Sequence, residues 1–131
     1  MKSKTSLLLL LICLFSCGCS PYNGKFKKVV SKIKQDKIFK SLDAKVRYEI
    51  EGGTSEVKPF VALLYLDYVD SKTGEAHSFR CRYNYQLTWL EDQERDWDWA
   101  LSVVEEADAE GEWVVSDAIQ TRPDFIKMLR P

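Results

Sequence analysis

The residues whose chemistry would be most direct are a few thiols and one imidazole. Cys81 is the only cysteine beyond residue 19, and His77 is the only histidine of the chain. A cysteine nucleophile needs a base within hydrogen-bond reach. These two residues lie four apart in a segment with strand alternation, so they would share a face but stand about 13 Å apart. The spacing argues against a Cys–His pair, and Cys81 is expected to be a buried free thiol that packs as a small apolar side chain.

The motifs that bind cofactors or metal ions are missing from the sequence. It contains no zinc-ligand spacing, no EF-hand, no phosphate-binding glycine loop and no nucleophile elbow. The sequence therefore predicts a protein without cofactor, metal or catalytic residues. One alternative stays open, an enzyme that uses a pocket acid such as Asp67.

The N-terminal segment holds the other three cysteines. Lys2 and Lys4 precede an apolar run, residues 7–15, which is too short to span a bilayer, and Ser16-Cys17-Gly18-Cys19 follows. This order resembles the lipobox of bacterial lipoproteins, in which the first mature cysteine takes a diacylglycerol. The resemblance implies that residues 1–18 are a signal peptide, cleaved before Cys17 or Cys19. Leu14 at the third position before the cysteine slightly favours Cys17, and the small Gly18 favours Cys19.

Acylation would place the protein at a membrane. Two or three acyl chains hold a protein firmly at a bilayer, whereas one binds only marginally. The expected location is the exported side of the cell membrane or the outer membrane, and the absence of Asp after either cysteine favours the outer membrane by resemblance to lipoprotein sorting. Residues 19–24 form a short spacer, which reaches at most roughly 15–20 Å. The domain would therefore lie close to the lipid headgroups.

Composition limits the remaining partners. Without Lys2 and Lys4 the chain has 17 basic and 20 acidic side chains. That balance does not favour nucleic-acid binding. The length after the leader suits one domain, residues 25–131, and sets no oligomeric state.

Hydrophobic periodicity predicts the elements of this domain. Apolar residues at i, i+3, i+4 and i+7 predict a lysine-rich helix over 25–42 that shifts or breaks near Gln35-Asp36. Alternation or short apolar runs predict strands over 44–51, 60–69, 78–90 and 113–119, and a short helix closes the chain at 122–129. Residues 97–107 fit either element, and strand is preferred because clustered carboxylates disfavour a helix C-terminus. In that strand, Trp97, Trp99, Leu101 and Val103 would share one face. Strict alternation in the strand over 78–90 would likewise put six residues on one face: Phe79, Cys81, Tyr83, Tyr85, Leu87 and Trp89.

The element order predicts an α+β fold. Sequential strands with short connections imply an antiparallel meander. We expect an N-terminal amphipathic helix packed on a curled antiparallel sheet of about five strands, followed by a short C-terminal helix. This order, with Gly111-Glu112-Trp113-Val114-Val115 at the last strand, resembles the cystatin-like and NTF2-like small lipoproteins.

Several side chains are candidates for binding. Lysines of the first helix could contact anionic headgroups: Lys25, Lys27, Lys28 and Lys32. Carboxylates near the last turn could meet a basic partner: Glu105, Glu106, Asp108 and Glu110. Arg80 and Arg82 would bind an anion or pair across strands, and Trp89, Trp97 and Trp99 would line a pocket or fill the core.

The sequence thus favours a lipid-anchored, non-catalytic binding or adaptor domain of the cell envelope. Its partners would be the membrane, through the lipid, and an envelope protein. Two alternatives stay open: an inhibitor or immunity-type lipoprotein that acts through an acidic loop, and an NTF2-like enzyme.

Overall fold

The computed structural model describes residues 21–51, 61–89 and 94–131. The predicted leader and both candidate lipidation cysteines lie outside these ranges. Along the chain the elements are α2 (Pro21–Gln35), α3 (Lys37–Leu42), β1 (Lys45–Glu51), β2 (Val61–Val69), β3 (Ala76–Trp89), β4 (Arg95–Ala107), β5 (Trp113–Val115), α4 (Ala118–Thr121) and α5 (Pro123–Leu129).

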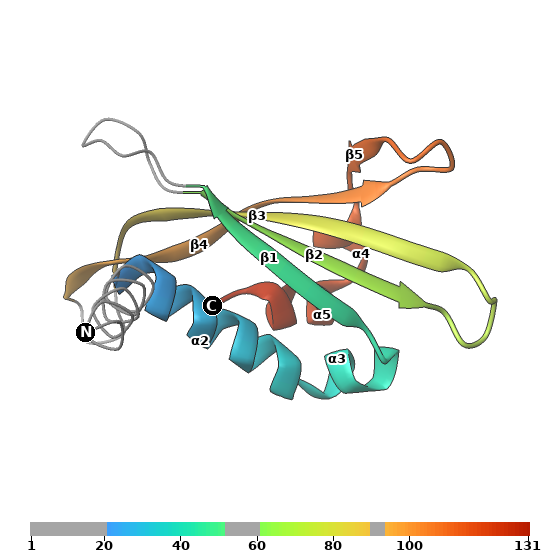
Figure 1. Cartoon of the computed structure of the whole chain (residues 1–131), viewed down its shortest axis with the longest axis horizontal. Helices are drawn as coiled ribbons and strands as arrows, with labels where there is room; N and C mark the ends of the chain where they lie inside the picture. The colour runs from blue at the N-terminus through green and yellow to red at the C-terminus, as the bar shows by residue number, and fades with distance from the viewer. Residues whose placement is uncertain (1–20, 52–60, 90–93) are drawn as a thin grey trace, which may run out of the picture.

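The five strands form one antiparallel sheet in the order β1-β2-β3-β4-β5, and the sheet is open (Figure 1). The α+β class with a five-stranded antiparallel sheet is therefore confirmed. Residues 97–107 belong to a strand, as the carboxylates at their end indicated. The helices lie on one face of the sheet, with α2 running beside the β1 to β4 layer and α5 next to it (Figure 1).

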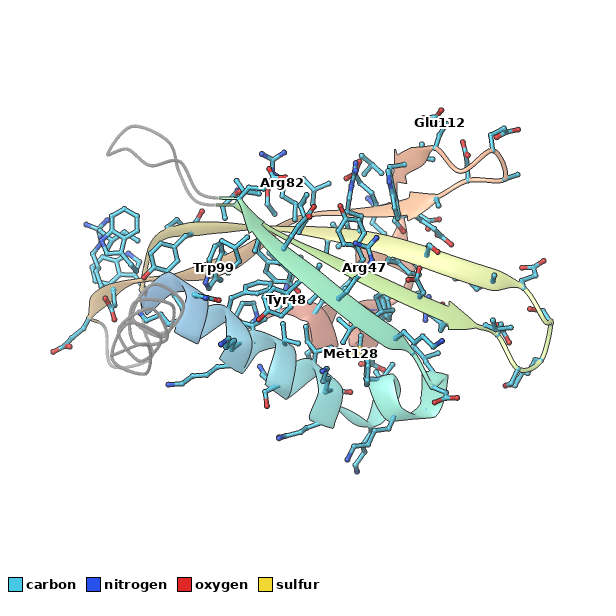
Figure 2. All side chains as sticks on the ribbon, viewed as in Figure 1. Arg47, Tyr48, Arg82, Trp99, Glu112 and Met128 are labelled. Carbon is cyan, nitrogen blue, oxygen red and sulfur yellow. The ribbon has the colours of Figure 1, made fainter. Side chains whose placement is uncertain are left out.

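The core lies between the sheet and these helices. Phe26, at its centre, has its ring 5.2 Å from the rings of Tyr48, Tyr83 and Trp99. Val29, Val30 and Ile33 complete the buried stripe of α2, and α5 contributes Phe125, Ile126, Met128 and Leu129. Figure 2 shows Tyr48, Trp99 and Met128 in this layer. Burial of apolar surface between one sheet face and two helices stabilises the domain.

Local chemistry explains where the helices begin and end. Asp36 separates α2 from α3, and its side chain accepts a hydrogen bond of 2.9 Å from the backbone N–H of Ile38. This N-cap starts a new helix direction at the predicted break. Pro123 stands in the first turn of α5, where its missing N–H costs nothing.

Two predictions about strands were wrong. The last strand does not run over 113–119 but ends at Val115, because the Ser116 hydroxyl accepts the backbone N–H of Ala118, which begins α4. The prediction that Val103 shares a face with Trp97, Trp99 and Leu101 of β4 is also wrong, because Val103 lies on the other face of the sheet.

The change comes from a β-bulge. Arg82 pairs with Val103, whereas Tyr83 pairs with Leu101, so Ser102 is an extra residue in β4. A bulge shifts alternation by one residue. Val104 therefore enters the core in place of Val103, which faces the other side.

Candidate functional site

The sheet face opposite the helices is open to solvent and carries a row of interacting side chains. Arg47, Tyr65, Arg80, Glu105 and Val115 are successive cross-strand partners from β1 to β5. The Arg47 guanidinium lies 3.9 Å from the centre of the Tyr65 ring, and the Arg80 guanidinium donates to Glu105 from Nε at 3.0 Å and from Nη2 at 2.9 Å. Planar guanidinium groups favour both kinds of contact.

Apolar side chains flank this row. Trp113 lies beneath the Arg80 guanidinium, 4.9 Å from it, and its ring is 6.0 Å from that of Tyr65. Leu63 and Val103 are half-buried on the same face, on either side of the exposed Arg82 in the next cross-strand row. Figure 2 places Arg82 on the side of the sheet away from the helices. We call this surface, made by Arg47, Leu63, Tyr65, Arg80, Arg82, Val103, Glu105, Trp113 and Val115, the open face.

The bulge in β4 decides which carboxylate joins the open face. Beyond Ser102 the odd residues of β4 turn outward, so Glu105 meets Arg80 while Glu106 points to the helix side. Cross-strand pairing of Arg80 with an acid was one of the two predicted alternatives. The other alternative, anion binding by both arginines, is left with Arg82 as its candidate residue, because the Arg80 guanidinium is paired with Glu105.

A second polar cluster lies on the helix side near the β2–β3 turn. The His77 Nδ1 atom is 3.0 Å from a Glu106 carboxylate oxygen, and the His77 ring stacks on Tyr68 with centroids 5.1 Å apart. The Tyr68 hydroxyl accepts a hydrogen bond of 2.8 Å from Arg122, whose guanidinium also lies 4.2 Å from the Phe125 ring centre. These contacts join three strands to the start of α5.

Sequence reasoning missed this cluster. The partner of His77, Glu106, is 29 positions away and faces inward only because of the bulge. An open hollow of about 400 Å³ adjoins the cluster and is lined by Asp67, Tyr68 and His77 among others. Asp67, the predicted pocket acid of an enzyme, is exposed and accepts a hydrogen bond of 2.6 Å from the Ser78 hydroxyl.

Cys81 is buried in the core, as predicted. Burial raises the pKa of its thiol from 9.0 to about 12. A thiol with so high a pKa carries almost no thiolate at neutral pH and is a poor nucleophile. Within residues 21–51, 61–89 and 94–131, no group of three His, Cys, Asp or Glu side chains could hold a metal ion.

The predicted lysine group lies along the exposed side of α2. Lys25 forms an ion pair of 3.2 Å with Asp96, and its ammonium also donates to the backbone carbonyl of Trp97. The backbone N–H of Trp97, followed by Lys25, lowers the pKa of Asp96 from 3.8. Lys32 donates to the carbonyl of Arg130, and Lys27 and Lys28 are exposed.

The predicted acidic group does not form one surface. Glu105 faces the open face and Glu106 the opposite side, whereas Asp108 and Glu110 lie in the β4–β5 turn. One carboxylate oxygen of Asp108 accepts the backbone N–H groups of Glu110 and Glu112 and so shapes this turn. Gly111 takes φ +81°, a left-handed conformation that glycine adopts without strain.

The tryptophans divide between core and solvent. Trp99 is in the core, so it lines no pocket, whereas Trp89 and Trp97 are exposed at 71% and 51% on the β3–β4 hairpin beyond the helix layer. Leu87 is exposed beside them. No helix in the described part of the chain combines the length and the apolar character needed to cross a bilayer.

Comparison with protein-family models, with curated proteins and with solved structures finds no match for this chain. The resemblances to bacterial lipoproteins and to cystatin-like or NTF2-like domains therefore stay predictions. The class that the structure itself defines is an α+β domain in which the described helices all lie on one face of an antiparallel sheet.

Proposed function

We propose that this protein is a lipid-anchored binding or adaptor domain of the cell envelope, acylated at Cys17 or Cys19, which presents its open face to an envelope protein. The observation that carries the proposal is the position of the described helices on a single face of the sheet, with aromatic, aliphatic and arginine side chains left on the other (Figure 1). An amphipathic helix packed on one face of a curled sheet completes the core on that side, so the opposite face is left for a partner.

The composition of the open face supports a protein partner. Protein interfaces are enriched in aromatic residues and arginine and depleted in lysine. Tyr65 and Trp113 lie at the centre of the open face, and Arg47 and Arg80 pack against their rings. Arginine and tryptophan side chains of this kind dominate binding energy where a partner excludes water from them. The partner surface that fits is flat and carries carboxylates opposite Arg82 and Arg47.

The chemistry of the described residues supports a non-catalytic role. Catalytic acids and nucleophiles are typically held in clefts where burial or neighbouring charges adjust their pKa. Here burial protonates the Cys81 thiol and encloses it in the core, and Asp67 is exposed. Among the described residues, no charged side chain is fully buried.

The membrane part of the proposal depends on the anchor. Acylation at Cys17 or Cys19 would tie α2 to the headgroup region through a spacer of a few residues, on the exported side of the cell membrane or the outer membrane. Lys27, Lys28 and Lys32 are exposed along α2, where each basic residue near an anionic surface adds about 1 kcal/mol.

Intact mass and membrane fractionation test the anchor. The wild type is compared with Cys17→Ala and Cys19→Ala. We expect the mass of a diacylglycerol-modified, cleaved chain in the membrane fraction, and its loss in one of the two variants, which identifies the acylated residue. An unmodified wild-type chain in the soluble fraction would refute the lipoprotein proposal.

Site-specific photo-crosslinking in intact cells tests the open face. A benzophenone amino acid replaces Arg82 on the open face or, as a matched control, Lys34 on the exposed side of α2. We expect one discrete adduct from position 82 that position 34 does not give, and its loss when Arg47→Glu is added. Equal adducts from both positions, or none from position 82, would contradict a partner on this face.

One observation favours a second candidate, an inhibitor or immunity-type lipoprotein. The β4–β5 turn projects at the opposite end of the molecule from the start of α2 and carries exposed Asp108, Glu110 and Glu112 (Figures 1 and 2). An acidic projection held away from the membrane suits a basic cleft of a hydrolase. In that case Glu110→Lys would abolish a stoichiometric complex with the hydrolase, and a crosslinker at position 82 would not react with that hydrolase.

A further inference from the structure

An exposed aromatic patch lies at the tip of the β3–β4 hairpin. Trp97 of β4 pairs across the strands with Leu87 of β3, and its ring stacks on Tyr85 at 5.8 Å. Trp89 lies two cross-strand pairs further out, opposite Arg95, whose guanidinium is 5.4 Å from its ring. These side chains alternate along the strands and so occupy the same face of the hairpin. We call Tyr85, Leu87, Trp89 and Trp97 the tip patch.

Tyr85 packs against the core ring of Trp99, whereas Leu87, Trp89 and Trp97 of the tip patch are exposed. Trp99, two residues along β4, is 2% exposed beneath Phe26 of α2, whereas Trp97 and Trp89 extend past the helix layer. A contiguous exposed patch of large apolar side chains marks a contact with a protein or a membrane. The indole ring has an apolar body and a polar N–H, and for that reason tryptophan concentrates at the level of lipid headgroups.

The start of α2 identifies the occupant as a membrane. The Lys25 ammonium bonds Asp96 and the carbonyl of Trp97, so the first turns of α2 lie against the base of the tip patch (Figure 1). Pro21, where α2 begins, is two residues after Cys19 and four after Cys17. Two to four extended residues reach about 7–14 Å. The proposed acyl chains must therefore enter the bilayer close to this hairpin.

The chemistry of the tip patch indicates which lipid surface fits. Leu87, Trp89 and Trp97 have no ionisable group, so their contact with lipid does not require a charged headgroup. Indole rings favour the headgroup level of a bilayer through their apolar body and polar N–H. A zwitterionic phospholipid interface, with the indoles as the attractive element, therefore suits this patch.

We propose that the tip patch is a second membrane contact, in which Trp89 and Trp97 enter the zwitterionic phospholipid interface beside the acylated cysteine. This rests on the proposed lipid anchor, which supplies most of the affinity. The tip patch fixes the orientation, because a second contact beside the anchor restricts rotation of the domain about the spacer. The β4–β5 turn then points away from the bilayer (Figure 1).

Tryptophan fluorescence with brominated lipid tests this contact. The purified full-length, acylated protein is reconstituted into vesicles of phosphatidylcholine with or without bromine on the acyl chains. Bromine quenches indoles that reach the bilayer, and two of the four tryptophans belong to the tip patch, so wild-type emission is expected to fall by about half. The Trp89→Phe/Trp97→Phe double variant is expected to lose this quenching.

Trp113→Phe is the matched control, since Trp113 lies on the open face. It keeps both tip-patch indoles among three tryptophans, so its emission is expected to fall by about two thirds. Circular dichroism checks that each variant is folded. Acylated, membrane-bound protein without quenching, or with equal quenching in the double variant, would overturn the tip-patch contact and leave the anchor intact. An unacylated wild type would instead refute the anchor itself, so the two failures are distinguishable.

Discussion

Trp97 and Trp99 lie two residues apart on β4 and on the same face, yet they have different environments. Trp99 is 2% exposed, with its ring 5.2 Å from that of Phe26 and 5.0 Å from that of Tyr85. Trp97 is 51% exposed and contacts the protein through one face of its ring, by stacking on Tyr85. The residue type and the face are the same, so the difference comes from α2, which covers one position and not the next.

This difference separates stability from binding within one strand. A large side chain under the helix contributes by removing apolar surface from water, at roughly 25 cal/mol per Å². The same side chain beyond the end of the helix leaves its apolar surface exposed to water, where a partner protein or a lipid can still cover it. Substitution of Trp99 should therefore lower the free energy of unfolding, whereas substitution of Trp97 should mainly affect binding.

Trp99→Ala should cost about 3–5 kcal/mol of the free energy of unfolding, since it leaves a cavity among Phe26, Tyr83 and Tyr85. Trp97→Ala should cost about 0.5–1 kcal/mol, the contribution of one exposed aromatic pair. Urea unfolding in detergent solution, followed by circular dichroism, measures both. Equal losses at the two positions would show that the helix layer extends over Trp97.

Val103 and Val104 allow the same comparison across the bulge. Val104→Ala should cost about 1.5–3 kcal/mol, because its side chain is fully buried, and Val103→Ala about 0.5 kcal/mol on the open face. The same unfolding experiment applies. The reverse order would mean that β4 alternates without interruption and that Ser102 is paired.

Tyr83 and Tyr65 compare a buried hydroxyl with an exposed one. The Tyr83 hydroxyl donates to the carbonyl of Leu129, and burial, with a smaller contribution from Cys81, raises its pKa well above 10.0. Tyr83→Phe leaves a buried carbonyl without its donor and should cost about 1–2 kcal/mol. Tyr65→Phe removes only an exposed bond to Glu49 and should cost less than about 0.5 kcal/mol. If both substitutions are neutral, the contact between α5 and β3 is not a constraint on the fold.

The sequence predicted the faces of the strands better than their environments. Strict alternation over 78–90 placed Phe79, Cys81 and Tyr83 in the core correctly. The same alternation predicted that Leu87 and Trp89 would face inward, which they do, but periodicity contains no information about where a covering helix ends. Only the assembled layers show that these two side chains are exposed.

Features that depend on the register between two strands could not be predicted from the sequence. The bulge at Ser102 exists because β3 and β4 pair with different registers above and below it. The adjacent valines Val103 and Val104 are its only trace in the sequence. Once the bulge is missed, the inward direction of Glu106 and its contact with His77 cannot be derived.

The smallest expected effect concerns the ion pair that joins the two environments of the hairpin. The backbone N–H of Trp97, and then Lys25, lower the pKa of Asp96 below 3.8, so the ionised carboxylate favours the folded state. Its contribution should be fully present above pH 3.8 and lost as the pH falls through the lowered value.

Asp96→Asn should therefore be slightly less stable than the wild type at neutral pH and equal to it in strong acid, because Asp96 is fully exposed and water screens the pair. Urea unfolding of both proteins across the acid range measures the difference. A difference that persists below the lowered pKa would assign the effect to the backbone hydrogen bond of Trp97 and not to charge. A difference that vanishes would assign the effect to the ionised carboxylate of Asp96, which accepts the Trp97 N–H and pairs with Lys25 at the start of α2.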